Sequence, residues 1–119
     1  MKINETVRKD GLRIISCKLS HKKTVWVGLV ARVGSAYDPK DKAGFFHLFE
    51  HMAFTGTTKR NVKDLQSFVR RNLFGYNAST HRLLTVYEVS AIDRKLPQAC
   101  DYLCDIYQNS TFPTRELAK

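Results

Sequence analysis

Two histidines and one glutamate stand at a spacing that is suited to binding a metal ion. His47, Glu50 and His51 lie in the segment 44–54, whose other residues are mostly large and apolar. At about 100° per residue the three side chains fall on one arc of a helix and interrupt its apolar surface. Ionisable groups on such a helix need partners that satisfy them. A divalent metal between the two imidazoles, with the carboxylate beside a metal-bound water, would satisfy all three.

This H-x-x-E-H spacing predicts a zinc site in which His47 and His51 are the ligands and Glu50 is the general base. Imidazoles at i and i+4 reach one Zn²⁺, and a catalytic zinc takes a third protein ligand and keeps a position for water. The metal lowers the pKa of that water, and a nearby carboxylate accepts its proton. H-x-x-E-H is the inverted form of the zinc-peptidase motif. The competing interpretation is a solvated helix face that binds no metal.

Further motifs accompany this segment in a fixed order. A Gly-Ser turn at 34–38 precedes it, the run H-M-A-F-T-G-T at 51–57 continues it, and N-A-S-T at 77–80 and T-V-Y at 85–87 come later. The segment 96–112 follows as a long helix that ends in a short loop. In these motifs the chain resembles the pitrilysin/insulinase family of inverted zinc peptidases, which includes mitochondrial processing peptidase. The resemblance covers essentially the whole chain and corresponds to the N-terminal part of the family's N-terminal domain.

The resemblance implies zinc-dependent hydrolysis of peptides by a metal-activated water. It implies that Zn²⁺ is the cofactor, and that Asn77 helps to hold the substrate backbone at a strand edge near the metal, where a peptide adds as an extra strand. The family's third zinc ligand is a glutamate whose position falls beyond Lys119. We therefore expect residues 1–119 to form one truncated peptidase domain, without a linker or a second domain, whose cleft another domain or subunit completes. The alternative is a non-catalytic fragment or partner-binding subunit of the same fold.

Other side chains of the chain offer alternatives for the third ligand. Glu88 or Glu116 would close the site if the chain bound zinc tightly on its own. A cysteine would close it if the chain were related to S-ribosylhomocysteine lyase, which uses the same inverted motif. The N-A-S-T segment is foreign to that lyase, however. Cys100 and Cys104 share a helical face with apolar residues, so we expect them to pack in the core.

The order of the predicted elements indicates an α+β domain. A chain of 119 residues with 43% hydrophobic residues is sufficient for one core. The pattern predicts a mixed or antiparallel sheet with helices packed on one face, resembling a truncated processing-peptidase-like metallohydrolase fold. The strand at 24–33 is expected to be central and covered on both faces, since both faces carry apolar residues. Asp41 and Asn61 are the expected caps of the two helices that follow. The predicted elements are a hairpin at 7–19 around Asp10-Gly11, strands at 24–33, after Asn72 and at 84–91, and helices at 44–54, from Asn61 and from Asp93 to Gln108.

Charge and composition argue against several classes of function. The net charge is +9, but the basic residues stand in ones and twos without a nucleic-acid-binding motif, so we expect no nucleic-acid partner. No apolar stretch approaches the roughly 20 residues of a membrane span, and the start of the chain has no apolar signal segment, so we expect no membrane partner. Three scattered cysteines, an odd number, suit a reducing compartment, and the expected location is the cytoplasm.

Overall fold

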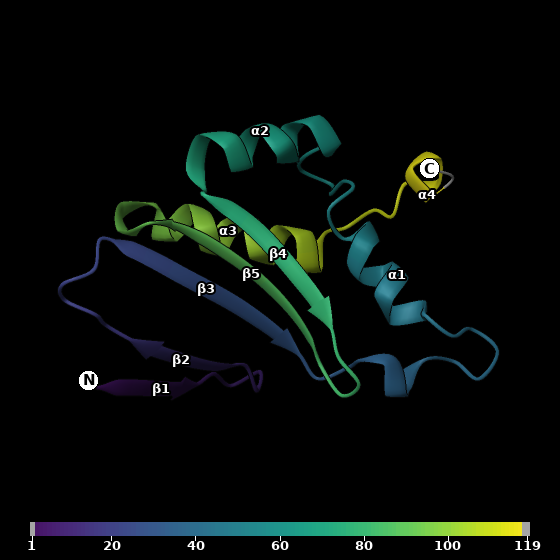
Figure 1. Cartoon of the computed structure of the whole chain (residues 1–119), viewed down its shortest axis with the longest axis horizontal. Helices are drawn as coiled ribbons and strands as arrows, with labels where there is room; N and C mark the ends of the chain where they lie inside the picture. Colours follow the sequence, from purple (N-terminus) through teal and green to yellow (C-terminus); the bar gives the residue numbers. More distant parts are fainter. Residues whose placement is uncertain (1, 118–119) are drawn as a thin grey trace.

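A three-stranded antiparallel sheet forms the centre of the structure, and the helices pack against one of its faces (Figure 1). The structure is a computed structural model and describes residues 2–117. The strand order is β3-β5-β4, so that β5 is the central strand. The strands are β3 (Thr24–Ala31), β4 (Gly75–Thr80) and β5 (Thr85–Ile92), and the helices are α1 (Phe45–Met52), α2 (Val62–Asn72), α3 (Leu96–Gln108) and the short α4 (Thr114–Leu117), with single turns η1 (Ser35–Tyr37) and η2 (Asp93–Lys95).

The two-residue period of the strands explains why one face of the sheet is buried. In β5 every second residue from Thr85 to Ala91 is buried, and the residues of β3 and β4 that share this face pack beside them. Helix α3 covers this face with its own apolar side, on which Tyr102 and Ile106 are fully buried. The buried core consists of Ala53, Leu65, Leu73, Tyr87, Val89, Ala91, Ala99, Tyr102, Leu103 and Ile106.

Helix α2 begins where the sequence predicts. The Asn61 side chain accepts a hydrogen bond from the Asp64 amide at 2.8 Å, and the Asp64 carboxylate accepts one from the Asn61 amide at 3.4 Å. This reciprocal pair is a capping box, which satisfies amide groups that the first turn of a helix leaves free. From this start α2 directs Leu65 into the core and stacks Phe68 on Tyr102 at 5.9 Å between ring centroids.

The predicted α+β architecture is confirmed, but the strand predicted to be central is an edge strand. Among residues 2–117, β3 pairs with β5 alone. Its second face is also uncovered, since Trp26 is 61% exposed and Val30 is 55% exposed. The prediction was wrong because apolar residues on both faces show that a strand is suited to burial, and say nothing of whether a cover is present.

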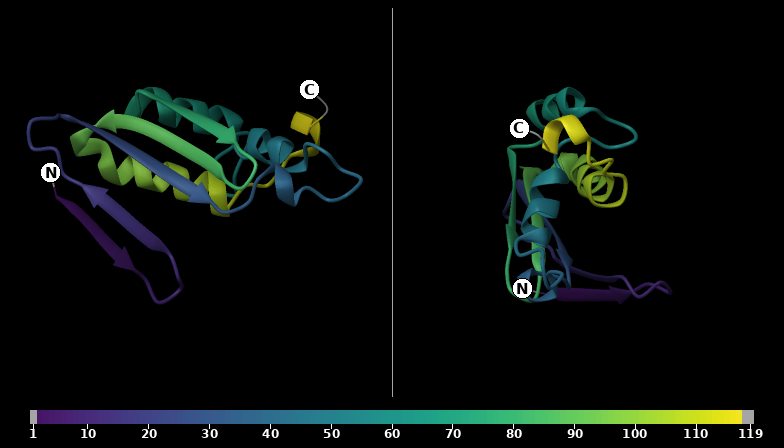
Figure 2. Two further views of the ribbon diagram at one scale, coloured as in Figure 1. Left: turned by 60° about the horizontal axis from the view of Figure 1, so that its bottom comes forward. Right: turned by 90° about the vertical axis from the view of Figure 1, so that its right-hand side faces the viewer.

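The N-terminal hairpin stands apart from the main sheet as a separate two-stranded sheet (Figure 2). Strand β1 (Ile3–Val7) pairs with β2 (Arg13–Cys17), and every residue of both strands is exposed. The turn is longer than the predicted pair Asp10-Gly11, because a backbone hydrogen bond between residues 8 and 12 closes the loop. Gly11 supplies the positive φ of 90° that this loop requires. The hairpin therefore contributes no apolar side chain to the core.

Cys100 and Cys104 lie on the exposed side of α3, so the prediction that they pack in the core was wrong. The core-facing arc of α3 centres on Tyr102 and Ile106, and both cysteines lie more than about 100° around the helix from that centre. The sequence pattern showed an apolar arc that is wider than the part of α3 the sheet covers.

Candidate metal centre

The three residues of the H-x-x-E-H motif converge on one point beside α1. The Nε2 atoms of His47 and His51 are 2.9 Å apart, and the ring centroids are 4.6 Å apart. One potential ligand atom from each of His47, Glu50 and His51 lies within 4.8 Å of the others. Both imidazoles are exposed, whereas Glu50 is 7% exposed. The cluster is therefore open to solvent on the histidine side and closed on the carboxylate side.

This donor set fits a zinc ion. Two imidazole nitrogens at about 2.0–2.1 Å from a tetrahedral zinc stand about 3.3 Å from each other. The separation of 2.9 Å between the two Nε2 atoms is shorter than this, and a rotation of either ring that parts them by about 0.4 Å restores zinc geometry. Since both rings are exposed, such a rotation disturbs no packed side chain.

The N-terminal end of α1 is held by Asp38, and the prediction of Asp41 as its cap was wrong. The Oδ2 atom of Asp38 accepts the amide hydrogen of Gly44 at 2.8 Å, and its Oδ1 atom accepts that of Phe46 at 3.0 Å. Gly44 stands at the N-cap position with a φ of 84°, a left-handed conformation that suits glycine. The loop folds back so that a carboxylate six residues before Gly44 reaches the first turn of the helix.

Gly34 ties this loop to the hairpin between β4 and β5. The Ser35 amide donates to the carbonyl of His81 at 3.0 Å, and the Ala36 amide donates to that of Arg82 at 2.9 Å. A Cβ atom on Gly34 would lie 2.0 Å from the His81 carbonyl oxygen, so only glycine permits this approach. The Gly-Ser turn of the sequence therefore fixes the path that brings Asp38 to α1.

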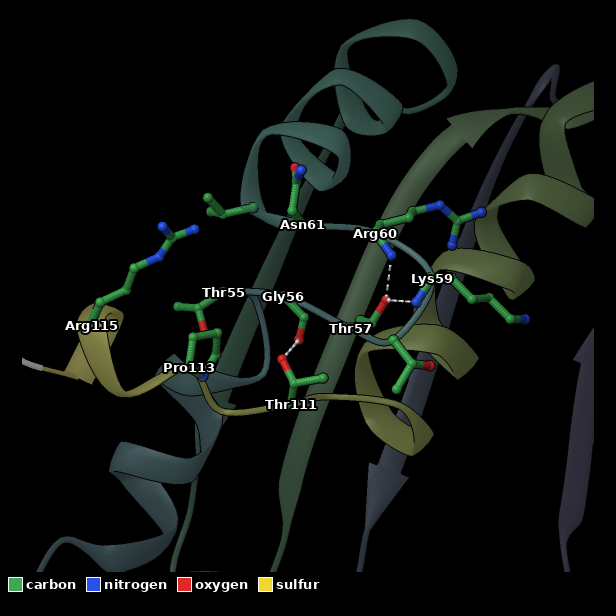
Figure 3. A pocket seen from close by; sticks show the side chains of 11 residues that line it. Thr55, Gly56, Thr57, Lys59, Arg60, Asn61, Thr111, Pro113 and Arg115 are labelled. Atoms are coloured by element: carbon green, nitrogen blue, oxygen red, sulfur yellow. Dashed lines mark hydrogen bonds between the residues drawn. The ribbon is translucent and has the colours of Figure 1, made fainter.

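The segment after α1 is held against α3 and the C-terminal loop (Figure 3). Gly56 has a φ of 152°, and its carbonyl accepts the Thr111 amide at 3.0 Å. The Thr57 hydroxyl accepts the amide of Arg60 at 3.0 Å and donates to Oδ2 of Asp105 at 2.8 Å. The F-T-G-T run that follows the H-x-x-E-H motif thus anchors the C-terminal end of α1.

A buried ion pair completes this anchor. The Arg60 guanidinium donates to Asp105 and to Asp101, each at 2.7 Å. The side chain of Asp105 is fully buried. Burial alone would raise the pKa of Asp105, but hydrogen bonds from Asn109 and its other partners, with the charge of Arg60, hold that pKa below its ordinary value. A hollow of about 300 Å³ lies beside this segment and is lined by residues 55–62 with Thr111, Pro113 and Arg115. His47, Glu50 and His51 are not among its lining residues.

The Glu50 carboxylate has a partner that the sequence analysis missed. Its Oε2 atom accepts a hydrogen bond from the hydroxyl of Thr80, at the end of β4. Tyr87 lies close by, and burial together with the charge of Glu50 raises the pKa of Tyr87 to about 12. The last residue of the N-A-S-T motif was the signal that pointed to Thr80, but a contact over thirty residues of sequence is visible only in the folded chain.

Asn77 lies on the same strand but on the other face of the sheet. It is three residues before Thr80, and an odd separation along a strand places two side chains on opposite faces. Asn77 is exposed, is paired with Glu88 of β5, and lines a hollow of about 220 Å³ that includes Trp26. Its side chain is therefore not part of the His47 cluster, although its strand forms an edge of the sheet.

Glu88, Cys100 and Cys104 are not part of the cluster. Among the described residues, the motif triad is the one group of three or more histidine, cysteine or acidic side chains placed to hold a metal ion. Glu88 faces the open side of the sheet, and both cysteines of α3 lie elsewhere. The side chain of Glu116 lies outside the described part of the structure.

Residues 13–119 match the family model described as Insulinase (Peptidase family M16). The chain belongs to this family. The resemblance that the motifs indicated is thereby confirmed.

The M16 chain has relatives that are much longer than itself. It is 40% identical over 114 residues to the beta subunit of mitochondrial-processing peptidase from Mus musculus. The aligned region covers 96% of this chain and 23% of that protein. It is 33% identical over 111 residues to a zinc protease of Rickettsia felis. The aligned region covers 93% of this chain and 27% of that relative. The chain therefore spans about a quarter of the length of these relatives.

Two solved structures show the same fold. Pitrilysin superimposes with a TM-score of 0.89 at 23% identity, over 98% of this chain and 13% of pitrilysin. A protease from Helicobacter pylori gives a TM-score of 0.90 at 24% identity, over 98% of this chain and 28% of the protease. None of the helices in the described part of this M16 chain has the length and hydrophobicity that crossing a membrane requires.

Proposed function

We propose that this chain supplies the zinc-binding part of a metallopeptidase that hydrolyses peptides. The observation that supports this most is the convergence of His47 and His51, whose Nε2 atoms are 2.9 Å apart with the Glu50 carboxylate in the same cluster. In this proposal the two histidines are zinc ligands and Glu50 is the general base. A zinc ion bound there would lower the pKa of a water molecule and polarise the substrate carbonyl.

Glu50 is suited to its role by the way it is held. The Thr80 hydroxyl donates a hydrogen bond to Oε2 of the Glu50 carboxylate, and Oε1 has no hydrogen-bond partner among the described residues. The bound oxygen fixes the orientation of the carboxylate, so that the second oxygen is directed to one position. A general base needs this kind of fixed geometry, because it must lie within hydrogen-bond reach of the proton that it accepts.

The outer edge of β4 is the proposed site for the peptide substrate. The backbone hydrogen bond from His81 to Leu84, at 2.8 Å, fixes the phase of the β4–β5 ladder. In an antiparallel pair alternate residues point their backbone groups away from the partner, so Tyr76, Ala78 and Thr80 direct theirs to the open edge. A peptide strand that binds there lies beside the residue that holds Glu50.

Asn77, on the same strand, is also proposed to contact the substrate. Its side chain faces the open side of the sheet, where every second side chain of an added strand would also lie. The contact is therefore with a substrate side chain or backbone on that face, and at a distance from the metal ligands.

The third zinc ligand is proposed to come from polypeptide outside this chain. A catalytic zinc takes three protein ligands, and the described residues provide two histidines and the base. The same missing polypeptide, as a second domain or a subunit, would form the other wall of the cleft. The alternative is that the isolated chain is a non-catalytic, partner-binding subunit, because two histidine ligands and water bind zinc weakly.

Zinc titration by calorimetry tests this proposal. We expect the chain to bind one zinc ion weakly, and His47→Ala to weaken binding by at least about tenfold. His21→Ala is the matched control, since His21 is exposed and lies outside the motif cluster. Glu50→Gln should retain zinc binding, and in a completed enzyme it should abolish peptide hydrolysis. Equal zinc affinity in His47→Ala and His21→Ala would contradict the proposed site.

A further inference from the structure

The last turn of α1 decides whether the two imidazoles of the motif converge. His51 is the penultimate residue of α1, which is eight residues long and ends at Met52. His47 and His51 share a face only while the backbone between them is helical, because residues four apart meet only on a wound helix. A helix of this length is marginal by itself, and helix ends fray. The proposed metal site therefore requires contacts that keep the last turn of α1 wound.

Residues 110–113, which we call the brace, contact the end of α1 and the segment after it. The Ser110 hydroxyl donates to the Met52 carbonyl at 3.4 Å. The Thr111 amide donates to the Gly56 carbonyl at 3.0 Å, and the Thr111 hydroxyl donates to the same carbonyl at 3.4 Å (Figure 3). The last carbonyls of a helix lack intrahelical partners, so the brace satisfies a group that the end of α1 leaves free.

Phe112 fastens the brace to α1 through its ring. The ring centroid lies 4.6 Å from that of Phe49, which itself packs with Phe45 and Phe46 at 6.5 and 6.4 Å between centroids. At about 100° per residue, Phe49 points about 180° away from the midpoint between the two motif histidines. The brace therefore contacts the back of α1 and leaves both imidazoles open to solvent.

The backbone of Phe112 is strained in the conformation that makes this contact. Its φ is 49°, and no other non-glycine residue among those described has a positive φ. The left-handed region is unusual for a bulky side chain, and the following Pro113 favours an extended backbone instead. The Phe112 side chain remains 39% exposed, so burial in the core does not account for the strain. Strained backbone of this kind is concentrated at functional sites, where it holds a group in place.

We propose that Phe112 is a positioning residue of the metal site, which keeps the last turn of α1 wound so that His51 stays in line with His47. Without the Phe112 ring, the brace would retain the hydrogen bonds of Ser110 and Thr111 and lose its contact with the back of α1. The last turn would then open more often, and zinc would bind only the fraction of molecules in which it is closed. The zinc part of this inference rests on the proposed function, whereas the winding of α1 does not.

Amide hydrogen exchange of the metal-free protein measures this opening. The Ala53 amide donates to the Phe49 carbonyl at 3.1 Å across the last turn, so its exchange reports on that turn. In Phe112→Asn we expect this amide to exchange about fivefold faster, from the loss of one aromatic pair. Asparagine adopts the left-handed conformation readily, so it removes the ring and keeps the path of the loop. The amide of Ile106, in the core of α3, reports global unfolding and should change less, because the variant also loses the strain of Phe112.

Zinc provides a second measurement, because winding of the last turn and metal binding must favour each other reciprocally. We expect Phe112→Asn to bind zinc about twofold more weakly than the wild type in calorimetry. Saturating zinc should slow the exchange of the Ala53 amide in this variant by at least about fivefold, since zinc binds the closed turn. In the double variant with His47→Ala, zinc should leave that exchange unchanged.

Two variants are the controls. Phe112→Tyr keeps the ring, so both its amide exchange at Ala53 and its zinc affinity should match those of the wild type. Phe74→Ala removes a phenylalanine that is 67% exposed and has no aromatic contact with a described residue, and it should also leave both quantities unchanged.

Three outcomes would overturn the proposal. One is equal Ala53 exchange in Phe112→Asn and Phe112→Tyr. Another is zinc that binds Phe112→Asn and leaves its Ala53 exchange unchanged, since the last turn would then have no part in the site. The third is a loss of protection at Ile106 as large as that at Ala53, because Phe112 would then serve global stability alone. A difference in exchange without zinc binding by the wild type would refute the proposed zinc site and still support the role of Phe112 in winding α1.

Discussion

The loop before α1 offers a direct test of how this helix is held. Asp38→Ala removes the carboxylate that accepts the amides of Gly44 at 2.8 Å and Phe46 at 3.0 Å. Loss of one N-cap side chain costs about 0.5–2 kcal/mol, and loss of a negative charge near a helix N-terminus costs about 0.3–1 kcal/mol more. Because Asp38 is half-buried and serves two amides, we expect the free energy of unfolding to fall by about 2 kcal/mol.

Urea denaturation followed by circular dichroism measures this change, and the midpoint of thermal unfolding should fall by about 6–10 °C. Asp41→Ala is the matched control, because it removes the same charge from the same loop. Asp41 is exposed and its side chain forms no hydrogen bond with any described residue, so its removal should change stability by less than about 0.5 kcal/mol. If Asp41→Ala were as costly as Asp38→Ala, the capping argument would be refuted.

Three further predictions concern the groups around Glu50 and α3. Asp105→Asn should lower stability at neutral pH by about 3 kcal/mol, since it breaks a buried pair with Arg60. The pKa of Asp105 is lowered in the folded state, so the stability that Asp105 provides is present above its unfolded pKa and is lost as pH falls through its folded pKa. Urea denaturation curves of the wild type and Asp105→Asn should therefore converge in acid. The raised pKa of Tyr87, to about 12, predicts that stability is lost as pH rises from about 10 towards that value, and that Tyr87→Phe removes one late step from an ultraviolet titration. Thr80→Val should lower kcat of a completed enzyme by about tenfold and leave the zinc affinity unchanged. Thr80→Ser keeps the hydroxyl, so its kcat should stay at the wild-type value. A parallel loss of zinc binding in Thr80→Val would contradict the role of Thr80 in orienting Glu50.

The edge position of β3 illustrates where sequence reasoning failed. Trp26 and Val30 gave β3 the pattern of a buried strand, and Cys100 gave α3 the pattern of a wide apolar face. Periodicity states which side chains share a face, because this follows from the local geometry of a helix or strand. It does not state whether another element covers that face, since this depends on segments distant in sequence or on another polypeptide. The open face of β3, with Trp26 and Val30, and the side of α3 that carries Cys100 are both apolar and both exposed.

The sequence by itself determined that His47, Glu50 and His51 share one face of a helix, because residues three and four apart on a helix are neighbours whatever surrounds them. It also determined the cap at Asn61, whose partner Asp64 is three residues away. Only the tertiary structure decided that Thr80 binds Glu50, since that contact joins a helix to a strand thirty residues later. Only the tertiary structure decided, too, that Asp38 and not Asp41 accepts the amides at the start of α1. Local spacing fixes which groups share a surface, and the path of the whole chain decides what that surface meets.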